Sequence, residues 1–267
     1  MKYVTYLKYL GVASAVLYLS ACGGNEEEQT ESENDVQEES SGEENQNSGD
    51  AESTDDAEAS EEAPLVTEED IYNEESILAL ANKSNFLGEE YVPADMIPVN
   101  VPVVFDNPET NQLREPAANA LMDLFAEAES EGYTLYARSG YRSYNTQVGL
   151  YNNYVANHGQ EEADRFSAQP GSSEHQTGLA MDVTSESVNL ELSEAFGETD
   201  EGTWVRENAH RFGFIIRYPD GYEDITGYMY EPWHLRYLGE EVASDVYESG
   251  LTYEEYIKES GIEINEE

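Results

Sequence analysis

The pattern of apolar and polar residues predicts helices and short strands that follow one another irregularly along the chain. Between residues 115 and 132, apolar side chains recur at intervals of three and four, which predicts a helix with Pro116 in its first turn and Gly132 as its cap. Further helices are expected at 144–157, 161–166, 203–211, 240–249 and 253–258.

Short runs rich in aromatic and branched apolar residues predict the strands. These runs are 133–137, 179–183 and 214–218, with two further strand-like segments at 228–231 and 234–237. Helices and strands are mixed without a regular βαβ alternation, which favours an α+β fold over a doubly wound one. We expect a small mixed, mainly antiparallel sheet with flanking helices. Residues 185–202 are acidic and show no regular spacing of apolar side chains, so we expect them to form an exposed excursion.

The first 22 residues predict a secretory signal. Lys2 and Lys8 give it a positive start, and the apolar run from Tyr9 to Leu19 is too short to span a bilayer comfortably. Small residues then lead to Cys22, the only cysteine, so the segment resembles a bacterial lipobox whose cysteine is lipidated. The simpler alternative is a signal peptide that ends near a cysteine by chance. A diacylated Cys22 would anchor the protein to the extracellular face of the cytoplasmic membrane.

Residues 23–70 consist mainly of acidic and small polar residues, so they predict a disordered tether. Asn25 to Asp70 contain 20 acidic and no basic side chains. Residues 71–267 form one predicted domain, with 38 acidic and 10 basic side chains. The net charge of -46 argues against nucleic acid as a partner, because its phosphates would be repelled. It also argues against electrostatic docking on anionic lipid.

Two motifs contain the residue types of a hydrolytic zinc site. The first places His175 and Asp182 seven residues apart, with Gly178 between them to let the chain turn. The second, Glu-Pro-Trp-His, supplies Glu231 and His234. Zinc hydrolases use three protein ligands and leave the fourth position to water, so His175, Asp182 and His234 are the expected ligands of one Zn²⁺ per domain. Glu231 remains as a base that takes a proton from water and passes it to the leaving amine.

Each candidate also has an ordinary structural interpretation. A single histidine is more often a surface or core residue than a ligand, and His158 and His210 fit that role. Asp182 lies in an apolar strand, where an unpaired carboxylate is costly, so a purely structural role explains it less well. Arg142 lies at a predicted junction between strand and helix, where it can bind a carboxylate or stabilise an oxyanion. Arg138 fits a structural ion pair better.

Three segments, at 139–147, 173–182 and 225–234, together resemble the VanY/LdcB-type zinc carboxypeptidases of the D-Ala-D-Ala dipeptidase and Hedgehog-like zinc fold. The similarity implies removal of a C-terminal D-alanine from peptidoglycan stem peptides. It implies that Glu231 is the catalytic base and that Arg142 holds the substrate and stabilises the tetrahedral intermediate. The implied zinc ligands are His175, Asp182 and His234.

The resemblance also places Gln147 and Ser173 in the substrate pocket. Tyr228 and Trp233 are candidates for its walls, although either could equally belong to the core.

The sequence therefore predicts a monomeric, membrane-anchored zinc carboxypeptidase in which zinc-activated water attacks the terminal peptide carbonyl. Two specificities stay open: the D-Ala-D-Ala bond of pentapeptides, or the bond between an L-centre and D-alanine in tetrapeptides. A rival from another class is a zinc-bearing module that binds wall peptides without cutting them. Such a module has no need of Glu231 as a base.

Overall fold

The computed structural model describes residues 64–265, and the fold below refers to that part of the chain. Cys22 and the predicted signal, with the predicted tether up to residue 63, lie outside the described residues. The helices are α1 Glu68–Tyr72, α2 Glu115–Ser130, α3 Tyr144–His158, α4 Gln160–Phe166, α5 Asp200–Asn208, α6 Glu223–Thr226, α7 Glu240–Ser249 and α8 Tyr253–Glu259. The strands are β1 Met96–Pro98, β2 Gln112–Arg114, β3 Tyr136–Ser139, β4 Ala180–Thr184, β5 Phe214–Tyr218 and β6 Glu231–Tyr237. Four short 3-10 helices complete the described elements: η1 Glu174–Thr177, η2 Glu186–Val188, η3 Glu194–Glu198 and η4 Ala209–Phe212.

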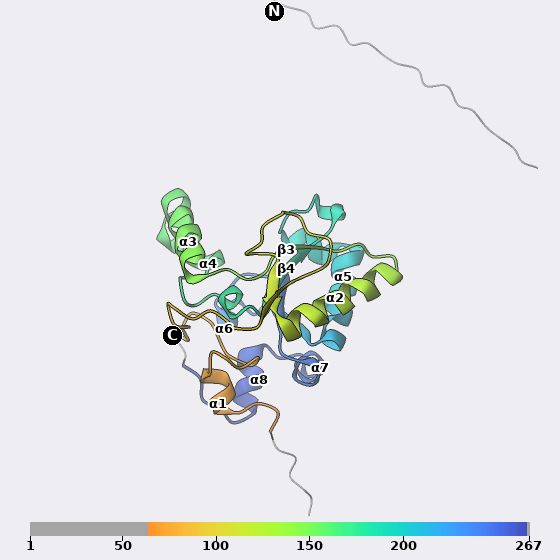
Figure 1. Cartoon of the computed structure of the whole chain (residues 1–267). Coiled ribbons are helices and arrows are strands. Elements are labelled where there is room, and N and C mark those ends of the chain that lie inside the picture. Colours follow the sequence, from red (N-terminus) through yellow and green to blue (C-terminus); the bar gives the residue numbers. More distant parts are fainter. Residues whose placement is uncertain (1–63, 266–267) are drawn as a thin grey trace, which may run out of the picture. The chain divides into compact units, whose positions relative to one another are not determined.

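A four-stranded sheet in the order β3–β4–β6–β5 lies among the helices (Figure 1). All of its strand pairs are antiparallel, and β1 and β2 form a separate antiparallel pair. Among residues 64–265, the parallel component of the expected mixed sheet is a single isolated bridge between Val103 and Ala137. The predicted α+β class with a mainly antiparallel sheet is confirmed.

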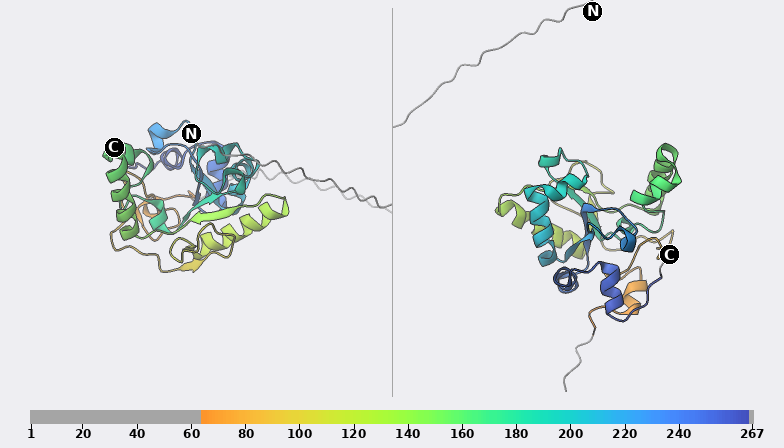
Figure 2. Two further views of the ribbon diagram at one scale, coloured as in Figure 1. Left: turned by 90° about the horizontal axis from the view of Figure 1, so that it is seen from above. Right: turned by 180° about the vertical axis from the view of Figure 1, so that it is seen from behind.

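The main hydrophobic core lies between the sheet and the helices α2 and α5, which cover the same side of it (Figures 1 and 2). Leu121, Leu124, Phe125 and Ala128 are buried on one face of α2, as the intervals of three and four predicted. Trp204 of α5 packs into the same core. Burial of this face holds the sheet, and thus the residues on β4 and β6, in one position.

A second core joins the two ends of the described chain. Ile71 of α1 packs with Tyr253 and Ile257 of α8, and Figures 1 and 2 show these helices side by side. Thr67 and Asp70 form a capping box that starts α1. The predicted domain boundary at residue 71 therefore falls inside a helix and is too late. The acidic composition of this segment predicted disorder, but the capping box and the burial of its apolar residues stabilise the helix.

Residues 185–202 also depart from expectation. They include η2, η3 and the start of α5, and Phe196 is fully buried in the main core. Many of the other side chains are exposed, so the prediction of an exposed excursion is only partly confirmed. The Thr199 hydroxyl accepts a hydrogen bond from the Gly202 amide, at 3.0 Å, so α5 begins at residue 200 instead of 203.

The strand expected at 133–137 begins three residues later, as β3. Gly132 has a φ of +95°, and the amide of Tyr133 donates to the carbonyl of Ala128 at 2.8 Å. Tyr133 therefore still belongs to the capped end of α2, and extended pairing starts only at Tyr136.

The helices α3 and α4 lie against each other at one side of the domain, away from α2 (Figure 2). Gln147 is the one residue of α3 that is buried. In the part of the chain that the structure describes, no helix combines the length and the apolar character needed to cross a bilayer.

Candidate metal centre and substrate cavity

The antiparallel register of β4 and β6 brings two of the candidate ligands together. Asp182 pairs directly with His234 across the two strands. His175 lies on η1, and the left-handed conformation of Gly178, with a φ of +66°, turns the chain from η1 into β4. The Asp182 Oδ1 atom is 3.5 Å from His175 Nε2 and 3.1 Å from His234 Nδ1. One donor atom from each residue lies within 4.8 Å of the others, so the three side chains converge on one point.

The outer ring nitrogens of both histidines are held by other partners. His175 Nδ1 is 2.8 Å from the carbonyl oxygen of Gly140, to which it donates, and this leaves Nε2 free for a ligand. His234 Nε2 is 3.1 Å from Glu174 Oε2, which leaves Nδ1 directed at Asp182 and the other donor atoms. Two imidazole nitrogens and one carboxylate oxygen with supporting hydrogen bonds form a donor set that suits Zn²⁺.

Burial and neighbouring charges set the protonation of these donors. Burial lowers the pKa of His175 to about 4, with a further contribution from the Arg142 charge, so this imidazole is neutral. Burial alone would raise the pKa of Asp182, but the two histidines hold it well below its usual range. For His234, burial is outweighed by hydrogen bonds to Asp182 and Glu174, which raise its pKa to about 9. A metal ion therefore competes with a proton at His234 Nδ1.

Glu231 lies at the start of β6, with Oε2 3.8 Å from His234 Nδ1. The pairing of β5 with β6 shifts register here: Ile216 is opposite Leu235, but Tyr218 is opposite Glu231. This irregularity, at the proline-bearing start of β6, lets residues three apart approach the same point. Burial raises the pKa of Glu231 to about 7, which suits a group that exchanges protons near neutrality.

A cavity of about 650 Å³ opens over the three donor atoms. Every site residue that the sequence analysis named within residues 64–265 lines it. These residues are Arg142, Gln147, Ser173, His175, Asp182, Tyr228, Glu231, Trp233 and His234. The sequence analysis did not anticipate Tyr154, Tyr218, Met229 and residues 192–195, which also line the cavity. Tyr228 is both a core residue and part of the pocket wall, since it is 3% exposed and still lines the cavity.

Three buried polar atoms around this cavity lack a hydrogen-bond partner within residues 64–265. They are Arg142 Nε, Gln147 Oε1 and the Tyr228 hydroxyl. Gln147 is held from its other side, because its Nε2 donates to the carbonyl of Ala168 at 2.6 Å. Unsatisfied polar atoms of this kind are costly unless a ligand or water completes them, so these groups indicate where a polar ligand binds.

Glu174, which is 1% exposed, is a further residue of the site that was not among the candidates from the sequence. Its Oε1 accepts from Arg217 Nε at 2.7 Å and from Arg236 Nη1 at 2.8 Å. Burial would raise the pKa of Glu174, but these two guanidinium charges hold it well below its usual range. The position of Glu174 beside His175 was a signal that it belonged to the site. Its arginine partners, 43 and 62 residues later, could not be assigned to it from the sequence.

The remaining candidates lie outside the centre. His210 stacks on Tyr247 with ring centroids 3.8 Å apart, and His158 is exposed at the end of α3. Arg138 forms an ion pair with Glu191 at 3.3 Å. All three therefore have the structural roles that the sequence analysis favoured for them.

The centre and the fold around it are those of a zinc carboxypeptidase. A family model described as "VanY: D-alanyl-D-alanine carboxypeptidase" matches residues 110–240, and the chain belongs to this family. The predicted family, the hydrolase class and the zinc cofactor are thereby confirmed.

Individual relatives agree with this assignment. "Putative carboxypeptidase YodJ" of Bacillus subtilis (strain 168) is 48% identical over 184 residues, which is 68% of this chain and 67% of the relative. The solved structure of the LdcB LD-carboxypeptidase is 49% identical, with a TM-score of 0.67 over 70% of this chain and 87% of that one. A mutant of the vancomycin resistance D,D-pentapeptidase VanY, solved in complex with Zn(II), is 32% identical, with a TM-score of 0.54 over 67% and 97% of the two chains.

Proposed function

We propose that this carboxypeptidase removes the C-terminal D-alanine from peptidoglycan stem peptides. The observation that supports the proposal most is the placement of Glu231 and Arg142 in the same cavity as the three donor atoms. A site of this kind offers a base, a metal centre and a cation for the terminal carboxylate within one enclosed space.

The chemistry divides between the metal and the chain. When bound, zinc supplies a Lewis acid that polarises a carbonyl and acidifies water. His175, Asp182 and His234 hold it, with two neutral nitrogens and one carboxylate. Glu231 takes a proton from the attacking water at its carboxylate and then delivers that proton to the nitrogen of the departing D-alanine.

Arg142 recognises the end of the peptide. A carboxypeptidase must bind a free C-terminal carboxylate, and a guanidinium group does so with two parallel hydrogen bonds. Arg142 Nε has no partner within residues 64–265, so it is available for this contact. Gln147 Oε1 is an acceptor and suits an N–H group of the peptide, while the Tyr228 hydroxyl can either donate or accept.

Two specificities are supported by different comparisons. The family description favours cleavage between two D-alanines at the end of a pentapeptide. The similarity to the LdcB LD-carboxypeptidase favours removal of D-alanine from a tetrapeptide. We take the first as the leading candidate and the second as its alternative.

The place of action follows from the predicted lipobox. Lipidation of Cys22 attaches the enzyme to the extracellular face of the cytoplasmic membrane, and the acidic tether predicted at 23–70 would let the domain reach away from it. The protein acts there as a monomer. Labelling with an alkyne fatty acid tests the anchor, and a Cys22→Ala variant that still incorporates the label contradicts it.

A muropeptide digest tests the activity. The purified chain is incubated with defined pentapeptide and tetrapeptide stems, and the products are identified by mass spectrometry. Loss of one alanine from the pentapeptide alone supports the leading candidate, and loss from the tetrapeptide supports the alternative. A chelator should abolish both, and added Zn²⁺ should restore them. Zinc binding without cleavage of either peptide would favour the binding module and reject the proposal.

A further inference from the structure

His234 lies between two carboxylates, one at each ring nitrogen. Asp182 Oδ1 is 3.1 Å from Nδ1, on the side of the metal donors. Glu174 Oε2 is 3.1 Å from Nε2, on the opposite side. The imidazole can therefore present Nδ1 to a metal only while Nε2 keeps its proton and its contact with Glu174.

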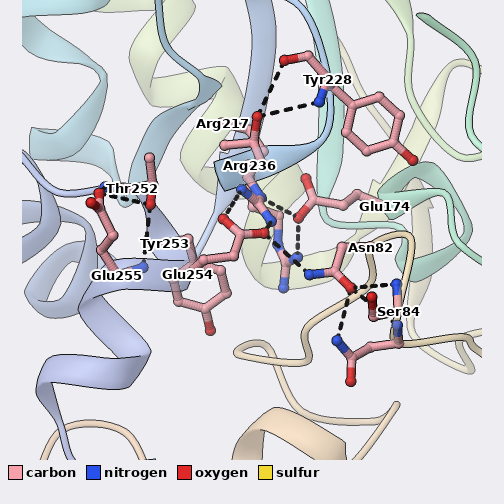
Figure 3. A network of polar contacts seen from close by, with 12 residues as sticks. Asn82, Ser84, Glu174, Arg217, Tyr228, Arg236, Thr252, Tyr253, Glu254 and Glu255 are labelled. Carbon is pink, nitrogen blue, oxygen red and sulfur yellow. Dashed lines mark hydrogen bonds and ion pairs between the residues drawn. The ribbon is translucent and has the colours of Figure 1, made fainter. Parts of the chain in front are cut away.

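The two oxygens of Glu174 have separate tasks. Oε2 is the partner of His234 Nε2. Oε1 accepts from both Arg217 and Arg236 (Figure 3). The side chains of Glu174 and both arginines are completely buried. The arginines fix the position of the carboxylate and compensate its charge, so that Oε2 stays directed at His234 Nε2.

The arginines are themselves held by distant parts of the chain. Arg217 donates from Nη1 and Nη2 to the two oxygens of Glu254 on α8, at 2.7 and 2.5 Å. Arg236 Nη2 donates to the carbonyls of Ile77 and Ala79. Figure 3 shows Arg217 and Arg236 between Glu174 and Glu254. We call Glu174, Arg217, Arg236 and Glu254 the buried charge network. The negative charges of its two carboxylates balance the positive charges of its two guanidinium groups.

We propose that Glu174 is a positioning residue for the metal centre, which orients His234 for zinc, and that Arg217, Arg236 and Glu254 act through it. Three segments outside the motifs, namely β5, α8 and residues 77–79, thus contribute to metal affinity. This role of Glu174 extends the proposed function. Only the measurement of kcat rests on that function, whereas the measurement of zinc affinity does not.

The decisive measurement is zinc affinity of the full chain, determined by competition with a chromophoric chelator. Glu174→Gln keeps the size of the side chain but replaces the carboxylate that faces Nε2 with an amide. We expect zinc affinity to fall by about 10- to 100-fold, the usual effect of losing such an outer partner. With saturating zinc, kcat should fall while KM stays close to the wild-type value. Unchanged zinc affinity in Glu174→Gln would overturn the proposal.

A matched control separates positioning from general destabilisation. Leu121→Ala removes a fully buried side chain from α2, in the main core. It should lower Tm without a change in zinc affinity. The visible spectrum of the Co²⁺-loaded chain gives a second readout, because it reports the geometry of the ligands. That spectrum should change in Glu174→Gln and stay the same in Leu121→Ala.

Glu254→Gln keeps the proposal testable if Glu174→Gln does not fold. It weakens the hold on Arg217 without touching His234, so we expect a smaller fall in zinc affinity. A lower Tm with unchanged zinc affinity in this variant would show that the network serves stability alone and would overturn the inference. Zinc affinity needs no substrate, so an absence of stem-peptide cleavage would reject the proposed function and leave this inference standing.

Discussion

The two walls of the cavity are built differently. The donor wall consists of η1, β4 and β6, and all five residues of β4 are buried. The rest of the lining includes α3 and residues 192–195, here called the recognition wall; within α3, Gln147 alone is buried, and residues 192–195 are half-buried or exposed. Asp182, Glu231 and His234 lie on strands fixed by sheet register, and His175 lies on η1, just before β4. Gln147 lies on the less buried recognition wall, whereas Ser173 and Trp233 lie on or beside the donor wall.

This difference leads to a simple expectation for substitutions. A change on the donor wall should reduce kcat or metal affinity, because it moves groups whose geometry the chemistry requires. A change on the recognition wall should raise KM and alter the preferred peptide. The four experiments below test this division, from the largest expected effect to the smallest.

Glu231→Gln should have the largest effect on turnover. It replaces the base with a group that cannot accept a proton, so kcat should fall by about 10²- to 10⁴-fold. Zinc affinity should remain, because Glu231 is not a donor. Stopped-assay hydrolysis of a defined stem peptide gives kcat, and a chelator competition gives the metal affinity. Wild-type turnover in this variant would exclude Glu231 as the base.

Arg142→Met should reduce kcat/KM by about 10²- to 10³-fold, because it removes the cation that faces the terminal carboxylate and the developing oxyanion. Arg142 comes from the junction between β3 and α3, and it is expected to contact both the terminal carboxylate and the oxyanion, so both kcat and KM should change. Arg211→Met, which removes a surface ion pair with Glu127, is the matched control and should behave as wild type. Equal kinetics of the two variants would remove Arg142 from the site.

Gln147→Ala should mainly affect binding. It deletes the free acceptor Oε1 on the recognition wall, together with the Nε2 donor that holds the Ala168 carbonyl. One hydrogen bond to the peptide contributes about 1 kcal/mol, so KM should rise roughly 5- to 10-fold. We expect kcat and zinc affinity to remain close to wild type. Michaelis–Menten measurements on the pentapeptide and the tetrapeptide check this. A fall in kcat without a rise in KM would contradict the division between the walls.

Glu109→Gln should have the smallest effect and should depend on pH. The Glu109 carboxylate accepts from the Ser143 amide at 2.9 Å and from the Thr146 hydroxyl, at the start of α3. Burial would raise its pKa, but these hydrogen bonds lower it below the ordinary value of 4.5. The pKa of Glu109 is lower in the folded chain than in the unfolded chain, so the ionised carboxylate stabilises the fold at pH values above the unfolded-state pKa. This stability is lost as the pH falls through the folded-state pKa.

Wild type should therefore be more stable than Glu109→Gln at neutral pH, by less than about 1 kcal/mol because the side chain is only half-buried and solvent screens its charge. The difference should disappear in acid. Thermal unfolding of both chains at several pH values measures it. A difference that grows on acidification would have the wrong sign for this explanation.

Local patterns predicted the elements whose burial follows from their own sequence. The face of α2 and the strand β5 are examples, because periodicity and composition determine which side chains are buried. The three donor residues were expected from the combination of two motifs: His175 and Asp182 flank Gly178, and His234 comes from the Glu-Pro-Trp-His segment. The features that could not be predicted depend on partners distant in the sequence. Phe196 is buried by segments that its acidic neighbours do not reveal, and Glu174 is held by arginines from β5 and β6.

The direct pairing of Asp182 with His234 has a consequence for folding. Side chains alternate along a strand, so a slip of β4 by one residue against β6 would turn Asp182 to the other face and separate it from His234. A misaligned sheet then offers no complete donor set. An ion that binds only the native form shifts the folding equilibrium toward that form. Zinc binding therefore favours chains with the correct strand register over misaligned ones.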